Sequence, residues 1–255
     1  PMRRLTAPSA LLGAALAAIA PAPAAAQEQY PTTATFYFWF PAAFVDLQNG
    51  LETHVERADL IDNLEFGFMG EVTHRRGPWL FGGELFYTDV SDDRSLTVPV
   101  SDGEPDVDSI DAVGDISVQT TMLQGFAGYE LLDNREARIH GTFGLRYASF
   151  ASDLEVRTDA GQGFALDLDE TTLDATVGLR IKAYLNDRWS MPVMVDGGTG
   201  GSRFTFQMFA GLTYEMGQNG FTVGYRKLEW MFDEDRDYLK RVQFNGPMIA
   251  YSRRF

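Results

Sequence analysis

The sequence predicts an all-β fold: an antiparallel, up-and-down β-barrel of about ten strands that spans a membrane, with eight strands as the alternative. Three observations support this prediction. Polar and apolar residues alternate over long segments, aromatic residues make up 13% of the chain, and 25 of its 255 residues are glycine. An apolar stretch near the N-terminus also indicates that the protein is exported. Membrane barrels combine these features because their strands alternate between lipid-facing and lumen-facing residues.

The first 26 residues have the three parts of a secretory signal peptide. Arg3 and Arg4 form a basic start, the apolar stretch 10–20 follows, and residues 24–26 are three alanines suited to cleavage. An N-terminal membrane anchor is the less favoured alternative, because the apolar stretch is too short to span a bilayer. We therefore expect residues 1–26 to be a signal peptide and residues 27–255 to form the barrel domain.

Charge and composition exclude several classes of protein. The formal net charge is −15, and binding to nucleic acid is not expected because it requires cations that neutralise phosphates. The chain contains no cysteine, so it has neither a disulfide framework nor a thiolate metal site. Beyond the signal peptide no stretch of about 18 apolar residues follows, so no transmembrane helix is expected.

Residues 171–185 form the clearest predicted strand. Its odd positions, from Leu173 to Leu185, are apolar, whereas Asp174, Arg180 and Lys182 occupy even positions. A shift of register by one residue would turn these charges toward lipid, at a cost of about 2–4 kcal/mol for each Arg or Lys at the midplane. The even positions are therefore expected to face the lumen.

The same alternation defines the remaining strands. The ten expected strands cover residues 34–45, 64–75, 79–90, 115–131, 137–152, 170–185, 188–197, 203–216, 220–232 and 240–255. Short connections fall at 76–78, 133–135, 186–187 and 217–219, and longer ones at 46–63, 91–114, 153–169, 198–202 and 233–239. Because outer-membrane barrels have short periplasmic turns and longer external loops, both termini are expected on the periplasmic side.

The chain ends in MIAYSRRF, an alternating stretch whose last residue is aromatic. Phe255 and Arg253 share the expected lipid face, where a charge near the membrane edge costs only about 0–1 kcal/mol. Phe255 is then part of an aromatic girdle at the periplasmic interface. The expected members of this girdle are Trp79, Tyr129, Trp189, Tyr214, Phe221 and Phe255. The C-terminal strand of a soluble sandwich is the less favoured alternative.

Strand 220–232 breaks the simple pattern. Strict alternation from Phe221 places Lys227 in the lipid, while Leu228 and Trp230 lie on the opposite face. We therefore predict a β-bulge near Arg226 and Lys227 that exchanges the two faces. In the first long loop, Leu51, Val55, Ala58 and Ile61 have helical spacing, which predicts a short helix over or inside the barrel mouth.

The side chains expected to line the lumen carry both signs of charge. They are Glu65, Glu71, Glu84, Arg138, His140, Arg146, Asp174, Arg180, Lys182 and Arg226. A mixed interior favours paired charges that fill a narrow barrel, because buried charges need partners. Barrels of about eight strands are filled by side chains and those of about 16–18 leave a channel, so ten strands lie near the filled end.

Several segments together resemble one protein family. They are Asp196–Ser202 (DGGTGGS), Phe204–Gln207, Ala210–Tyr214, Gly224–Arg226, Gly246-Pro247, Asp62–Gly70, Gly77–Trp79 and the terminal Phe255. These segments resemble porin-like β-barrel proteins of the outer membrane in Gram-negative bacteria, of the alphaproteobacterial type. The resemblance implies the fold and a location in the cell outer membrane. It implies no catalytic motif, and the terminal strand resembles the signal that the barrel-assembly machinery reads.

These observations predict a non-enzymatic outer-membrane protein, either structural or a narrow passive channel for small solutes, with no cofactor and no catalytic or metal-binding residue. One alternative is a surface-binding, adhesin-like barrel that acts through acidic external loops. The other is a rim hydrolase of the omptin type around His54, which depends on strand number alone. The expected partners are outer-membrane lipid and lipopolysaccharide, the barrel-assembly machinery at the C-terminal strand, and divalent cations at the acidic loops.

Overall fold

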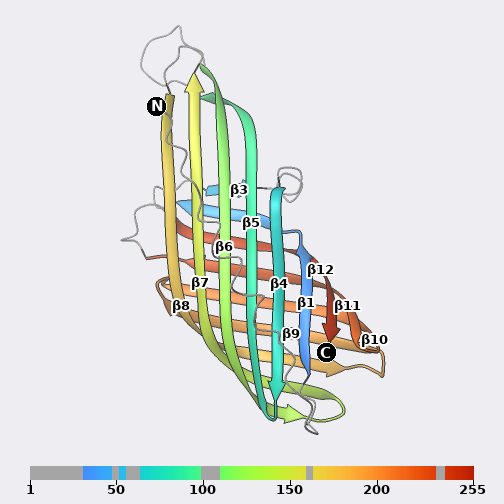
Figure 1. Ribbon diagram of the computed structural model, residues 1–255. Helices are drawn as coiled ribbons and strands as arrows, with labels where there is room; N and C mark the ends of the chain where they lie inside the picture. Colours follow the sequence, from blue (N-terminus) through green and yellow to red (C-terminus); the bar gives the residue numbers. More distant parts are fainter. Residues whose placement is uncertain (1–30, 48–51, 56–63, 99–109, 159–162, 234–238) are drawn as a thin grey trace, which may run out of the picture. The chain divides into compact units, whose positions relative to one another are not determined.

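The computed structural model describes residues 31–47, 52–55, 64–98, 110–158, 163–233 and 239–255. Side chains are described for residues 31–46, 67–90, 119–151, 169–233 and 239–255. The described residues form one antiparallel sheet that closes on itself, because β1 pairs with both β4 and β12 (Figure 1). The expected signal peptide, residues 1–26, lies outside the described residues.

Ten strands close the barrel, and one additional strand is attached to it. The strands are β1 (Thr32–Trp39), β2 (Ala42–Leu47), β3 (Glu52–Val55), β4 (Leu64–Arg76), β5 (Trp79–Val98), β6 (Ile110–Asp133), β7 (Ala137–Thr158), β8 (Gly163–Tyr184), β9 (Trp189–Gly200), β10 (Phe204–Met216), β11 (Asn219–Met231) and β12 (Leu239–Arg254). β1 and β2 are two halves of the first barrel strand: both pair with β12, and Phe40 and Pro41 interrupt them. β3 pairs with β2. The predicted ten-stranded antiparallel barrel is therefore confirmed.

Short turns join the strands at one end of the barrel. The start of β1 and the end of β12 lie at this same end. The β4–β5 and β10–β11 turns contain Gly77 (φ 59°) and Gly217 (φ 62°). Glycine adopts this left-handed backbone without the steric cost of a side chain. Both hairpins keep their register to the turn, with Arg76 opposite Trp79 and Met216 opposite Asn219.

The outer face of the barrel is apolar and the inner face is polar over the same length of strand. In β8, Val177 has 69% of its surface exposed, whereas Asp174 and Thr176 are buried inside. The same holds for Phe143 and Leu145 on β7 and for Val223 on β11, all exposed on the outside. Water would oppose this inverted pattern, and lipid favours it. The barrel therefore spans a membrane.

Exchanging Val177 for Arg tests this assignment, because Val177 lies midway along the apolar stretch of β8. The free energy of unfolding in lipid vesicles is expected to fall by about 2–4 kcal/mol, the cost of a cation at the bilayer midplane. Thr171→Arg, on the same outer face near the end of that stretch, is expected to cost about 0–1 kcal/mol. Urea titration in vesicles measures both values. Equal costs at the two positions would contradict a bilayer midplane near Val177 and a membrane edge near Thr171.

The predicted girdle residues lie at the turn end of their strands. Trp79 packs against Tyr129 at 5.1 Å between ring centroids, and Trp189 packs against Tyr214 at 4.9 Å. Phe221 packs against Tyr251 at 5.2 Å. Phe255 is exposed, with the Arg253 guanidinium 5.6 Å from its ring. These rings are exposed or half-buried on the outer face, as aromatic belts at membrane interfaces are.

The predicted β-bulge at Arg226 and Lys227 is wrong. Both residues pair regularly with β10 and β12, so the register is unbroken. Lys227 stays on the outer face and forms an ion pair with Glu229 at 2.7 Å, while Leu228 and Trp230 are fully buried inside the barrel. The faces do not exchange; instead, β11 leaves the apolar band at Lys227, where the outer face becomes polar and the interior becomes apolar.

The predicted helix in the first long loop is wrong where it can be compared. Val55 belongs to β3, whose residues Glu52–Val55 pair with Ala43–Asp46 of β2. The backbone of this segment extends the sheet as a strand paired with β2, and not as a helix. The other three residues of the predicted helix, Leu51, Ala58 and Ile61, lie outside the described residues.

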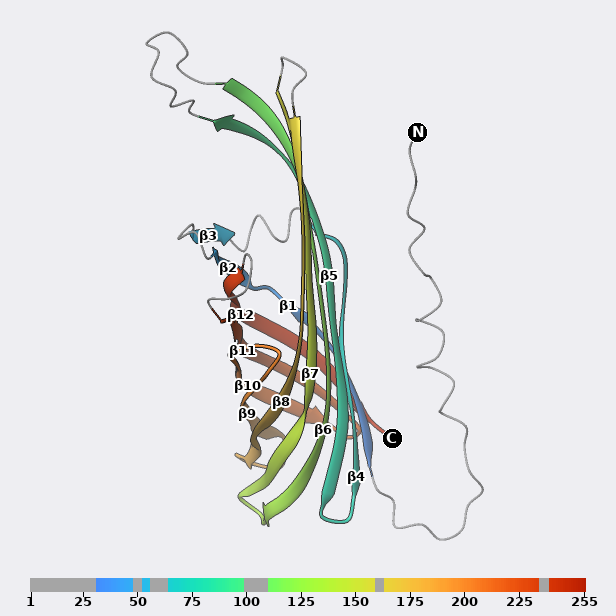
Figure 2. The same cartoon turned by 90° about the vertical axis from the view of Figure 1, so that its left-hand side faces the viewer.

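Two long hairpins, β5–β6 and β7–β8, extend well past the other strands of the barrel (Figures 1 and 2). Strands β5 to β8 have 20, 24, 22 and 22 residues, whereas a membrane-spanning strand needs about 9–11. Their pairing continues to Val98 opposite Ile110 and to Arg157 opposite Gly163. Much of the expected loops 91–114 and 153–169 is therefore strand. These segments carry many polar residues, but outside lipid a strand does not require the apolar alternation used to find it.

Candidate functional site

The candidate functional site is the lumen of the barrel, which has three levels along its length. A cavity lies near the short turns, buried charges occupy the centre, and aromatic side chains fill the part farthest from the turns. We refer to these as the turn-end cavity, the central charged level and the outer apolar level. Each is formed by inward-facing side chains of regular strands, so strand parity positions all three.

Arg226 of β11 is the centre of the first buried charge cluster. Its guanidinium donates hydrogen bonds to Glu84 Oε1 at 2.5 Å, to Gln207 Oε1 at 2.7 Å and to the Tyr37 hydroxyl at 2.9 Å. Tyr37 in turn donates a hydrogen bond to Glu84. The guanidinium also lies 5.1 Å from the ring of Trp39. Four strands, β1, β5, β10 and β11, are thereby joined across the lumen.

Arg146 of β7 is the centre of the second cluster. It forms an ion pair with Asp196 of β9 and donates hydrogen bonds to Gln124 Oε1 at 3.0 Å and Thr205 Oγ1 at 2.9 Å. Nearby on β8, Asp174 accepts hydrogen bonds from the Ser202 backbone N–H at 2.8 Å and from the Thr172 hydroxyl at 3.0 Å. Each buried charge therefore has a counter-charge or hydrogen-bond donors, which buried ions require.

The outer apolar level closes the lumen beyond the charges. Leu228, Trp230 and Met122 have no exposed surface, and Phe86 has 1%. Trp230 packs edge-to-face on Phe150 at 5.1 Å between ring centroids. Rings from β7 and β11 thus meet inside the barrel and pack closely there.

The sequence analysis missed the outer apolar level, because it assigned Leu228 and Trp230 to a lipid face. A signal was present in the neighbouring residues of opposite parity. Lys227, Glu229 and Arg241 lie on the outer face of β11 and β12 and form ion pairs there. Charged residues on the outer face mark the end of the apolar band, and the apolar residues between them then face inward.

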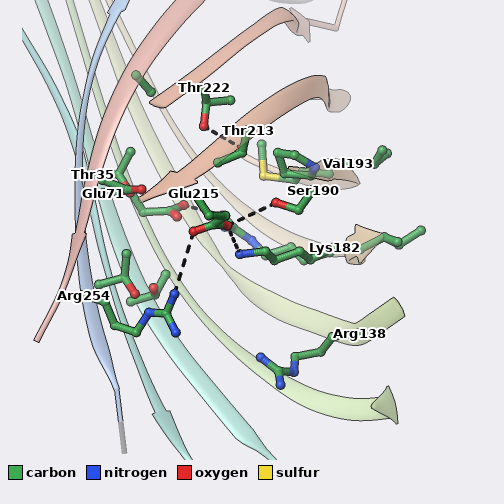
Figure 3. Close-up of a pocket in the computed structure, with 18 of the residues that line it drawn as sticks. Thr35, Glu71, Arg138, Lys182, Ser190, Val193, Thr213, Glu215, Thr222 and Arg254 are labelled. Carbon is green, nitrogen blue, oxygen red and sulfur yellow. Dashed lines mark hydrogen bonds and ion pairs between the residues drawn. The ribbon is translucent and has the colours of Figure 1, made fainter. Parts of the chain in front are cut away.

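The turn-end cavity has a volume of about 690 Å³ and reaches from the short turns to Glu84 and Arg226. Figure 3 shows Glu215 of β10 near its centre, approached by side chains of three other strands. Glu215 accepts hydrogen bonds from Lys182 Nζ at 2.6 Å and Ser190 Oγ at 3.1 Å, and Arg254 lies 3.8 Å away. On the facing wall, Arg180 pairs with Glu71 at 2.6 Å.

The structure brings most of the predicted lumen residues together. Glu71, Glu84, Arg138, His140, Arg180, Lys182 and Arg226 line the turn-end cavity, and Arg146 and Asp174 are buried in the central charged level. The side chain of Glu65 lies outside the described residues. Sequence reasoning did not include Tyr37, Gln207 or Glu215 among the site residues. Glu215 has the same parity as Thr205 and Thr213 on β10, so extending the alternation to the turn would have found it.

Metal-binding groups and the rim histidine are considered next, within the described part of the chain. No group of three or more His, Asp or Glu side chains there is arranged to hold a metal ion. His54 belongs to β3 and is paired with Phe44, and its side chain lies outside the described ones. Within the described residues, no helix is both long enough and apolar enough to cross a membrane.

Comparison with solved structures identifies the fold. The chain is similar to the translocator domain of the autotransporter NalP from Neisseria meningitidis, with a TM-score of 0.54, 13% identity, and coverage of 89% of this chain and 88% of that one. Ail of Yersinia pestis, with a TM-score of 0.37 and 11% identity over 89% and 98% of the two chains, is more distant and carries no argument. No protein-family model and no curated protein matches the sequence.

At 13% identity, the likeness to NalP defines the fold alone. Together with the apolar outer face, the aromatic rings at the turn end and the closed antiparallel sheet, it defines the class of protein. The chain is a membrane-spanning β-barrel of the outer-membrane type.

Proposed function

We propose that this protein is a non-enzymatic, structural outer-membrane barrel with a lumen closed to ions, which carries a four-stranded extension outside the membrane. The observation that carries the proposal is the closure of the lumen. The central charged level joins β1, β5, β10 and β11 through Arg226, and the outer apolar level covers it with unexposed side chains such as Trp230. A passive channel would need a continuous wet path.

The extension supports a role at the cell surface. Beyond the apolar band, strands β5 to β8 stay paired to Val98 and Gly163, although the membrane requires only about 9–11 residues per strand. At a rise of about 3.3 Å per residue, paired strands of that length carry Val98 and Gly163 well away from the lipid. A surface-binding role through the acidic loops agrees with this arrangement, and we propose it as the use of the extension.

Planar-bilayer recordings test the closed lumen. The refolded protein, shown to be folded by its heat-shifted gel mobility, is expected to give no conductance steps at any salt concentration. The double variant Arg226→Ala/Trp230→Ala, which removes a large buried side chain from each of the two levels, is the matched comparison and is expected to conduct. Discrete steps from the unaltered protein would overturn the proposal.

A narrow passage for small solutes is the second candidate, and the turn-end cavity favours it. A space of about 690 Å³ lined by Arg180, Lys182 and Glu215 can hold a hydrated polar solute. Passage would require the central charged level to open. Conductance steps in the recordings above, with a selectivity set by these charges, would support this candidate instead of the closed barrel.

The proposed partners follow from the same features. Lipid and lipopolysaccharide would surround the apolar face, and the barrel-assembly machinery would recognise β12 together with the exposed Phe255 that follows it. Divalent cations would bind at the acidic loops. We also propose that the chain belongs to the alphaproteobacterial-type family that its glycine- and aromatic-rich segments resemble. The net charge of −15 opposes a nucleic-acid partner.

A further inference from the structure

The barrel wall is incompletely paired between its first strand and β4. β1 pairs with β4 only from Thr32 opposite His74 to Phe36 opposite Gly70. Beyond this point β1 continues to Trp39 and β4 continues to Leu64, but the described residues form no further pair between the two strands. Figure 2 shows β1 diverging from β4 toward β2. The wall therefore opens between these strands.

An apolar pocket of about 210 Å³ lies at this opening. Its lining comes from both sides of the gap and from the lumen. Residues 36–41 and residues 67–69 of β4 contribute, with Phe86, Thr88 and Val90 of β5 and Phe244 of β12. The outer rim is formed by Phe36, Phe38 and Phe68, which are exposed on the lipid face, with Phe38 exposed to 68%. The inner wall includes Trp39, which is 4% exposed, and Phe86. The pocket thus connects the lipid-facing surface with the edge of the buried lumen.

The pocket lies near the end of the apolar band that is away from the short turns. Phe40 donates a backbone hydrogen bond to Pro247 at 3.0 Å. Two residues before Pro247 on β12, Asn245 accepts a hydrogen bond from Tyr225 at 2.8 Å on the outer face. Asp89, beside the pocket residues Thr88 and Val90, accepts one from Gln119 at 3.1 Å. These polar groups mark the membrane boundary just beyond the pocket, whose own mouth lies among the exposed phenylalanines.

We propose that this pocket binds the end of one alkyl chain of a lipid from the surrounding membrane. The pocket has no charged lining residue, so it suits a hydrocarbon and not a headgroup. An apolar cavity of about 150 Å³ can hold benzene, so the larger pocket has room for the end of a chain but not for a whole lipid.

Trp39 supplies a direct probe, because it lines the pocket and is one of four tryptophans. The single-tryptophan variant Trp79→Phe/Trp189→Phe/Trp230→Phe is refolded into phosphatidylcholine vesicles whose acyl chains carry bromine near their methyl ends, and into unbrominated vesicles. Bromine quenches tryptophan at contact. Trp39 is expected to lose most of its fluorescence in the brominated vesicles despite its low exposure. The quenching of Trp39 can also be obtained without the triple substitution, as the difference in quenched fluorescence between the unaltered protein and Trp39→Phe.

Two matched controls decide the outcome. A variant retaining only Trp230, which is buried in the outer apolar level, is expected to keep its fluorescence. A variant whose only tryptophan replaces Val177, which lies midway along the apolar stretch on the lipid face, is expected to lose it. Gly67→Leu and Thr88→Leu, which narrow the pocket from two strands, are each expected to restore Trp39 emission.

Quenching of Trp39 no stronger than that of Trp230, or unchanged by both narrowing variants, would overturn the proposal. So would quenching by free bromobenzene but not by brominated lipid, which would indicate a free solute. Bilayer conductance does not enter this test, so it is independent of the proposed closed lumen.

Discussion

Replacing Glu84 with alanine is expected to lower the free energy of unfolding by about 3–5 kcal/mol, because it leaves the guanidinium of Arg226 buried without its counter-charge. Arg226 is 2% exposed and pairs with Glu84 at 2.5 Å. Tyr37 and Gln207 would keep their hydrogen bonds to Arg226, but neither carries a charge. Urea titration in lipid vesicles, followed by heat-shifted gel mobility, measures the loss.

The matched control for Glu84 is Asp133→Ala, at the turn end of the same barrel. Asp133 pairs with Arg138 at 2.9 Å and Arg75 at 3.5 Å, but these side chains are more than a quarter exposed. Water can replace the lost partner there, so the expected cost is about 0–1 kcal/mol. If Glu84→Ala costs no more than Asp133→Ala, the central charged level does not hold the barrel together.

Trp230→Ala is expected to cost about 3–5 kcal/mol, the usual range for removing a large buried aromatic side chain. Trp230 is fully buried and packs on Phe150 at 5.1 Å. The loss would leave a cavity in the outer apolar level, where rings from several strands meet. The same vesicle titration gives the change in free energy of unfolding.

Trp79→Ala is the control for Trp230, since it removes the same side chain from the lipid face. Trp79 is 39% exposed on the outside and packs on Tyr129, and lipid can fill the space that it leaves. Its cost is expected to be clearly smaller than that of Trp230→Ala. A reversed order would mean that the apolar residues inside the barrel are not its stabilising core.

The two predictions concern two halves of one interior, which reverses its polarity along the strands. Near Arg226 the inside is charged and the outside apolar, whereas near Trp230 the inside is apolar and Lys227 and Glu229 form an ion pair on the outside. Lipid surrounds the first part, and water meets the outer face of the second. Each part therefore buries the side chains that its own surroundings disfavour.

The amino-acid sequence by itself determined the strand number, the antiparallel order and most lumen positions. These depend on local alternation, and a charge such as Arg180 or Lys182 can face only one way when the other way is lipid. The inward orientation of Glu71 follows from the same alternation.

Only the tertiary structure decided the features that depend on where the lipid ends and on which strands meet. Alternation has the same period inside and outside the membrane, so it could not show that Leu228 and Trp230 face inward without a bulge. It also could not show that Glu84 of β5 meets Arg226 of β11, or that β1 leaves β4 after Phe36. Those contacts join residues far apart in the chain, and they are set by closure of the barrel.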